Sequence, residues 1–225
     1  MCGRYTLYET ERLAETYSLD KNTQLDLLDN FNVAPGQYMP VIINDGKNNR
    51  LKKMRWGFIP HWARDPKIGY KLINAKMESV FDKPMWKQTV LTQRCLVPAH
   101  GFYEWQVIED GKTKVPYFIY PKNTHIFSFA GLYSIWKDVE GVEIPSFTIL
   151  TSEPNKEMMP IHNRMPVILT VEEAETWVNP GYNNQPDKIR QVLHPYPDNS
   201  LELYKVSSDV NSTRNNKREL IYSII

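Results

Sequence analysis

Three short turns, each between two apolar runs, constrain the fold of this chain more than any other feature. Asp-Gly at residues 45–46 separates YMPVIIN from RLKKMRWGFI, Asp-Gly at residues 110–111 separates FYEWQVI from VPYFIYP, and Glu-Gly at residues 140–141 separates IFSFAGLYSIW from IPSFTILT. Asp-Gly between apolar runs is a strong signal for a tight β-hairpin, because glycine accepts the positive φ that such turns require. The middle of the chain is therefore predicted to be a set of antiparallel hairpins.

Short helices are predicted outside this β-rich middle. In ETERLAETYSL, Leu13 and Tyr17 are four residues apart, which is the spacing of one helix face. Thr170 and Glu173 form the signature of a capping box at the start of TVEEAETWV, and Pro186 stands in the first turn of QPDKIRQVL. The pattern indicates an α+β fold, in which peripheral short helices surround an antiparallel, barrel-like β core.

Length and composition favour a single domain over residues 1–225. The 225 residues are 41% hydrophobic, which is enough for a substantial core, and no repeat or low-complexity linker divides them. No apolar stretch approaches the ~20 residues of a membrane span, and charged residues interrupt the opening before an export signal could form. With only Cys2 and Cys95, we expect a cytoplasmic location and no disulfide framework.

Net charge and cysteine spacing limit the kinds of partner and cofactor that we expect. The formal net charge is +1, so no global field attracts nucleic acid and any such binding must be local. Neither cysteine has the spacing of a zinc motif, and Cys95 is expected to be a small buried hydrophobe. We therefore expect no cofactor, no metal and no membrane partner, and a monomer.

Cys2 is the first candidate for chemistry. Its small side chain suits removal of Met1, which would leave a free α-amine beside the thiol. The amine titrates near ~8 and the thiol near ~8.5, so each has a reactive fraction at neutral pH. An amine and a thiol on one residue condense with an aldehyde, first to an imine and then to a five-membered thiazolidine. An aldehyde-bearing substrate is therefore the natural partner, and the alternative is a frayed terminus.

Three further segments hold candidate polar side chains. Asn74 in LINAKMES could act in a site, although a turn or cap is the commonest role of asparagine. Glu104 lies among aromatic residues in GFYEW, where a buried carboxyl would have a raised pKa and could shuttle protons, but strand alternation could equally turn it to solvent. His162 and Arg164 precede an apolar strand in PIHNRMPVIL, and the arginine suits an anion such as phosphate.

Aromatic residues interleave with basic ones in MRWGFIPHWARD. Trp56, Phe58 and Trp62 could belong to the core or could form a stacking platform for bases. This combination fits single-stranded nucleic acid, although each signal alone is weak.

Six segments together resemble the SOS response-associated peptidase (SRAP) family in wording and order: MCGRY, NVAPGQ, RWGFIPHWA, INAKMES, RCLVPAHGFYEW and IHNRMPVIL. The resemblance runs from Cys2 to about Leu169, and the ordered set is highly specific. It implies a DNA-damage protein of the SOS response and DNA repair, which recognises abasic sites in single-stranded DNA and links itself to them covalently. The C1′ aldehyde of a ring-opened abasic sugar is the electrophile that an aminothiol needs.

The resemblance also implies roles for four catalytic residues. Cys2 would form the thiazolidine, and Asn74 would orient the amine and the sugar. Glu104 would shuttle protons during ring opening and imine formation. His162 would act near the sugar and thiol as a second acid or base. An imine at C1′ also permits β-elimination, so an associated lyase activity is a further expectation.

The DNA contacts implied by the resemblance are basic and aromatic residues: Arg4, Trp56, Phe58, Trp62, Lys76 and Arg164. Family members commonly have arginine where this chain has Lys76, and lysine cannot make the bidentate phosphate contact of arginine. The departure weakens that one contact and leaves the covalent chemistry intact. When bound to DNA, the protein would be found at the nucleoid.

Two other functions stay open at this point. One is a cysteine peptidase or N-terminal-nucleophile amidohydrolase, a hydrolase in which Cys2 attacks an amide; it predicts peptide turnover through a thioester. The other is a non-catalytic module for single-stranded DNA, which predicts that Cys2→Ala leaves affinity for intact and abasic DNA unchanged.

Overall fold

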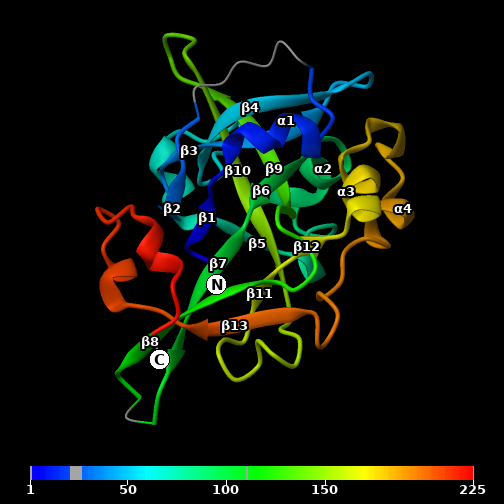
Figure 1. Ribbon diagram of the computed structural model, residues 1–225. Helices are drawn as coiled ribbons and strands as arrows, with labels where there is room; N and C mark the ends of the chain where they lie inside the picture. The colour runs from blue at the N-terminus through cyan, green and yellow to red at the C-terminus, as the bar shows by residue number, and fades with distance from the viewer. Residues whose placement is uncertain (1, 21–26, 110, 225) are drawn as a thin grey trace.

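Five strands of the protein close into a barrel (Figure 1). The computed structural model describes residues 2–20, 27–109 and 111–224. Around the barrel the order is β10, β4, β3, β6 and β9, and an antiparallel β9–β10 pair completes the circle. The bounds of these strands are Tyr38–Asn44 (β3), Asn49–Trp56 (β4), Arg94–Ala99 (β6), Phe127–Lys137 (β9) and Glu143–Ser152 (β10). The predicted α+β fold with a barrel-like core is confirmed.

The expectation of an antiparallel barrel needs one correction, because the barrel is mixed. Strand β10 pairs in parallel with β4, where Ser146 lies opposite Arg55, and in parallel with β5 (Asn74–Lys76), where Ile149 lies opposite Asn74. The hairpins β3–β4 and β9–β10 are antiparallel as predicted, and so is β7–β8, although Asp110 in its turn lies outside the described residues. The parallel pairs join segments far apart in the sequence, so no local turn signal reports them.

A second sheet packs against the barrel and carries the start of the chain. Its order is β13, β8, β7, β1 and β2, with bounds Leu201–Lys205, Lys114–Pro121, Gly101–Val107, Tyr5–Leu7 and Asn30–Val33. Only His100 separates β6 of the barrel from β7 of this sheet. Gly101 is required here, because a Cβ atom at this position would lie 2.2 Å from the ring of Phe118.

Short helices lie at the periphery (Figure 1). Helix α3 (Val171–Val178) begins with the predicted capping box, in which Thr170 and Glu173 bond reciprocally, and α4 (Pro186–Arg190) begins at the predicted proline. The predicted N-terminal helix is a 3-10 turn, Thr10–Arg12, followed by α1 (Leu13–Thr16). Helix α2 (Pro84–Thr92) was not predicted from the sequence.

The remaining elements are short: η2 (Pro66–Lys71), η3 (Met77–Ser79), β11 (Met165–Pro166), β12 (Ile168–Leu169), η4 (Pro180–Tyr182), η5 (Ser208–Asn211) and η6 (Arg218–Ile221). None of the helices formed by the described residues has the length and apolar character that a membrane crossing requires.

Aromatic packing joins β1 to the barrel. Tyr5 is fully buried, and its ring contacts those of Trp56 and Phe129 edge-on, at centroid distances of 5.2 and 5.9 Å. Burying a large apolar side chain contributes about 1.5–3 kcal/mol, so these contacts fix the N-terminal strand firmly. Cys95 is also buried, as predicted. The start of the chain is thereby held against the barrel.

Candidate active site

Cys2 is buried rather than frayed. Its side chain has no solvent exposure and belongs to the main hydrophobic core. Burial raises the pKa of the Cys2 thiol well above its usual range, and the nearby carboxylate of Glu104 adds to the rise. The expectation of an untuned thiol with a reactive fraction at neutral pH is therefore wrong for this fold. The thiol is held in its protonated form beside an acidic group.

Glu104 reaches this position through the pairing of β1 with β7. Tyr5 lies opposite Phe102, and the N–H of Tyr103 donates to the carbonyl of Arg4 at 2.9 Å. Continuing this antiparallel register places Gly3 beside Glu104. Since side chains alternate along a strand, Glu104 shares a face with Phe102, which packs on the barrel residue Phe129. Glu104 is accordingly 3% exposed, so the reading in which it faces solvent is excluded.

Asn74 fixes the main chain of Cys2. Its Nδ2 donates a hydrogen bond of 2.8 Å to the Cys2 carbonyl, while its Oδ1 is buried and has no hydrogen-bond partner among the described residues. Parallel pairing of β5 with β10 sets its position. A buried acceptor without a donor costs about 1–3 kcal/mol, and such a group is commonly completed by a ligand. The structure therefore joins Cys2, Asn74 and Glu104, three residues from distant parts of the sequence.

His162 is positioned by the turn that follows β10. Its Nδ1 lies 3.0 Å from the backbone N of Arg164, from which it can accept, and 3.2 Å from the Arg164 carbonyl oxygen, to which it can donate, so the main chain of Arg164 holds the ring in either tautomer. Its turn is tied to β7 by Gln106, whose Nε2 donates to the Pro160 carbonyl at 3.0 Å. One side-chain hydrogen bond thus ties the turn that carries His162 to β7, the strand of Glu104.

The side chains of Arg164 and Arg4 already make hydrogen bonds within the protein. The Arg164 guanidinium makes a bidentate pair with Glu78, at 2.7 and 2.9 Å, and its side chain is only 12% exposed. Its Nε is buried and without a hydrogen-bond partner among the described residues. Arg4 Nη1 donates to Asn32 and to the Val210 carbonyl, and burial lowers the Arg4 pKa. A phosphate at Arg164 must therefore exchange with the Glu78 carboxylate.

Two of the aromatic residues predicted to stack on bases cannot do so. Trp56 is fully buried and Phe58 is 2% exposed, so neither ring offers a face to a base, and that prediction is corrected. Trp56 instead supports the site, because its indole N–H donates to the carbonyl of Ile73 at 3.0 Å, directly before Asn74. Trp62 is 57% exposed, so it keeps an open ring.

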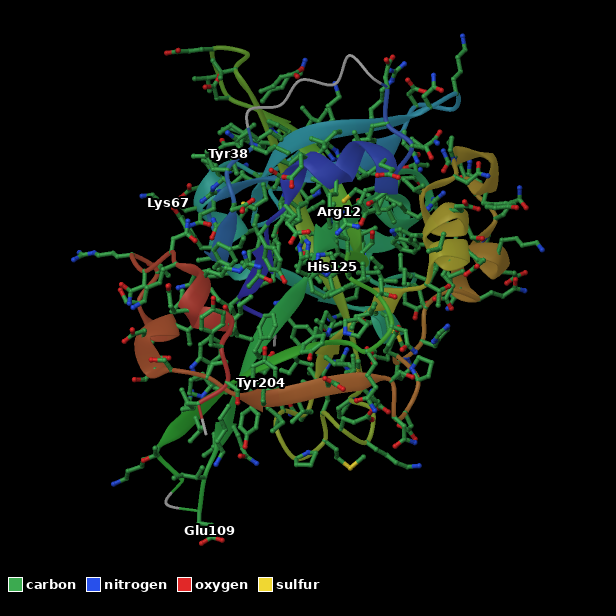
Figure 2. The ribbon with its side chains drawn as sticks, viewed as in Figure 1. Arg12, Tyr38, Lys67, Glu109, His125 and Tyr204 are labelled. Carbon is green, nitrogen blue, oxygen red and sulfur yellow. The ribbon has the colours of Figure 1, made fainter. Side chains whose placement is uncertain are left out.

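Two exposed tyrosines, Tyr38 and Tyr70, lie in segments for which the sequence analysis predicted no function. Tyr38 and Tyr70 are 46% and 62% exposed, and the Arg55 guanidinium lies over the Tyr70 ring at 4.5 Å. Tyr38 pairs directly opposite Arg55 across β3 and β4. Figure 2 shows Tyr38 and Lys67 on the same side of the molecule. Strand alternation could not have indicated Tyr38, because the four residues after it, 39–42, are all buried.

Lys76 is exposed at the end of β5. It lies two residues from Asn74 on the same strand and therefore on the same face. Its ammonium group is thus directed to the side of the sheet from which Asn74 reaches Cys2.

Comparison with known proteins identifies the family of this chain. The chain is 47% identical over 225 residues to the abasic site processing protein YoqW of Bacillus subtilis, covering 99% of this chain and 100% of the relative. It is 45% identical to the abasic site processing protein YoaM of the same organism, and the match covers 98% of this chain and 97% of the relative. A crystal structure of a Bacteroides thetaiotaomicron protein superposes with a TM-score of 0.88 at 28% identity, covering both chains fully. The family model described as SOS response associated peptidase (SRAP) matches residues 1–213, and the chain therefore belongs to the SRAP family.

Proposed function

We propose that this protein processes abasic sites in single-stranded DNA by linking Cys2 to the ring-opened sugar. The observation that carries the proposal is the anchoring of Cys2: Asn74 holds its carbonyl, and Glu104 lies beside its thiol. The relatives named as abasic site processing proteins support the same substrate. Once Met1 is removed, the Cys2 amine would lie in this anchored segment.

The proposed reaction has two bond-forming steps. The Cys2 amine attacks the C1′ aldehyde, and loss of one water gives an imine. The thiol then adds to the same carbon, its proton passes to the nitrogen, and a thiazolidine closes. Since burial keeps the thiol protonated, the second step needs a proton acceptor beside it, and Glu104 is the carboxylate in that position. Asn74 Oδ1, a buried acceptor with no partner among the described residues, would accept an N–H of the amine or a sugar hydroxyl.

The DNA would be held by exposed basic and aromatic side chains near β5. Lys76 shares its face with Asn74, and the segment that leads into β5 carries Trp62 and Tyr70. We propose Trp62 and Tyr70 as surfaces for base stacking, with Arg4 and Arg164 as further phosphate contacts. His162 would act as the second acid or base, and β-elimination from the imine would give the lyase activity.

The rival peptidase mechanism fits this site less well. A nucleophilic cysteine of a peptidase is normally activated by a lowered pKa, whereas burial and Glu104 raise the pKa of Cys2. A thiol that must first give its proton to a neighbouring carboxylate is better suited to close on an imine already formed on the same residue than to attack an amide as a preformed thiolate.

Intact mass spectrometry tests the proposal. Protein lacking Met1 is mixed with single-stranded DNA that carries one abasic site. The expected product has the mass of protein plus DNA minus one water. Cys2→Ala and a protein with a blocked N-terminus should give no stable product. Equal binding of intact and abasic DNA without an adduct would support the non-catalytic module, and turnover of a peptide through a thioester would support the hydrolase.

A further inference from the structure

We propose that Glu9, His100 and His125 form a binding site for a divalent cation of the zinc class. One nitrogen from each imidazole ring and one Glu9 carboxylate oxygen all lie within 4.8 Å of one another. Two imidazoles and a carboxylate are a common ligand set for Zn²⁺, with a water molecule in the fourth position. The sequence analysis predicted no metal site because that prediction rested on cysteine spacing. These three residues come from distant segments and form no sequence motif.

His100 is the residue that most clearly points to a ligand. It is 3% exposed, and its Nε2 is buried with no hydrogen-bond partner among the described residues. Its Nδ1 accepts the N–H of Tyr8 at 3.4 Å, which is a long contact. Buried polar groups nearly always have a partner, so an imidazole with so little bonding needs an explanation. A metal ion on Nε2 would supply the missing partner; the ring proton would then lie on Nδ1, so the long contact with the Tyr8 N–H would be given up.

Aromatic stacking fixes the His100 ring. Tyr8 stacks on it with a centroid distance of 3.8 Å, and Tyr8 also stacks on Phe31 at 5.0 Å. The backbone N–H of His100 donates to the Thr6 carbonyl at 3.0 Å. His125 approaches His100 edge-on, with the ring centroids 5.0 Å apart. One ligand is thus preorganised in the core, as metal sites require.

The other two ligands are at the surface and can adjust. His125 Nε2 and Glu9 Oε2 are already 2.9 Å apart, with side chains 50% and 31% exposed. Tetrahedral zinc bonds of about 2.1 Å place ligand atoms about 3.4 Å apart, so the 2.9 Å pair must open by about 0.5 Å and the widest separation, at most 4.8 Å, must close by up to about 1.4 Å. Arg12 also contacts Glu9 Oε2, at 3.2 Å, but it is 54% exposed and can turn to solvent.

The surroundings leave room for the cation and its water. His100 and His125 line a hollow together with Tyr8, Tyr120 and Tyr204. Figure 2 shows Arg12 and His125 as neighbours on the face toward the viewer, with Tyr204 below them. Glu9 does not line this hollow, so a cation held by all three residues would lie at its edge, between the buried ring of His100 and the Glu9–His125 pair.

A bound cation would join three separate segments of the chain. Glu9 follows β1, His100 stands between β6 and β7, and His125 belongs to the loop before β9. The expected effect is therefore stabilisation of the region that holds β1 and β7. This role does not depend on the proposed reaction with DNA, and its test uses no DNA.

Metal titration of the full chain tests the site. Protein freed of metal with a chelator is titrated with Zn²⁺ and with Co²⁺. We expect one equivalent to bind, a cobalt spectrum of nitrogen and oxygen ligands, and a higher melting temperature. Glu9→Gln and His125→Asn should each weaken binding at least tenfold. His194→Asn is the matched control, because it removes another histidine paired with a glutamate, Glu173, and should bind like the parent.

Three results would overturn the site. The first is no stoichiometric binding by the parent protein. The second is unchanged affinity in both Glu9→Gln and His125→Asn. The third is a thiolate charge-transfer band with cobalt that Cys2→Ser removes. His100→Asn should also abolish binding, and if it fails to fold, the two exposed positions still decide the question.

Discussion

Removing the Asn74 side chain tests whether the anchor of Cys2 controls the reaction. In the structure Asn74 Nδ2 donates to the Cys2 carbonyl at 2.8 Å, and Oδ1 is a buried acceptor open to a donor. Asn74→Ala removes both groups. If each hydrogen bond contributes about 1 kcal/mol in the reacting complex, the loss is about 2 kcal/mol, or a crosslinking rate about 30-fold lower. Stability should change by less than about 1 kcal/mol, because the unpartnered acceptor is removed with the bond.

The measurement is a single-turnover crosslinking rate on denaturing gels, combined with a urea unfolding curve. Asn49→Ala is the matched control, because Asn49 Nδ2 makes the same kind of bond, to the Tyr17 carbonyl at 2.9 Å, away from the site. We expect Asn49→Ala to lower stability and to react at the parental rate. A rate for Asn74→Ala within twofold of the parent would refute the reasoning, and so would an equal loss of rate in Asn49→Ala.

Three other predictions follow from contacts described above. Gly101→Ala should destabilise the fold by at least about 1–3 kcal/mol through overpacking against Phe118, seen as a lower urea midpoint; an unchanged midpoint would contradict the close approach. Arg164→Gln should remove one phosphate contact, so that the plot of log K against log salt for single-stranded DNA becomes shallower by about 0.7; an unchanged slope would remove Arg164 from the DNA contacts. Burial would lower the pKa of His194, but the Pro195 carbonyl and Glu173 outweigh it and raise the pKa. Protonated His194 therefore stabilises the fold below about pH 6.5, and this stabilisation is lost as pH rises through the folded-state pKa. The melting temperatures of the parent and of His194→Asn should converge at high pH.

Local signals in the sequence predicted the elements that depend on local contacts. The hairpin turns and the capping box of Thr170 and Glu173 each involve residues a few positions apart, and the structure confirms them. The parallel pairing of β10 with β4 was not predictable in this way, since Ser146 and Arg55 are brought together only by closure of the barrel. Mixed topology is therefore a property of the whole chain.

Three residues of the candidate site could be predicted from the sequence as a group, but their environment could not. The motif resemblance pointed to Cys2, Asn74 and Glu104, and the structure places them together. The roles of the aromatic residues were harder to predict, because the pattern RWGF is equally consistent with core packing and with an exposed stacking surface. The indole of Trp56 was assigned to DNA, whereas burial assigns it to the support of Asn74. Solvent exposure depends on tertiary packing that a local pattern does not contain.

The bond from Asn74 is made to a main-chain carbonyl, which every amino acid possesses. Residue 2 would therefore keep its position in the site if its sulfur were replaced by oxygen. A Cys2→Ser protein should then dock on damaged DNA and dissociate again, because the oxazolidine that a hydroxyl closes is hydrolysed far more readily than a thiazolidine. In the proposed mechanism, docking and covalent capture are therefore separate steps, and a single-atom exchange would let docking be measured without capture.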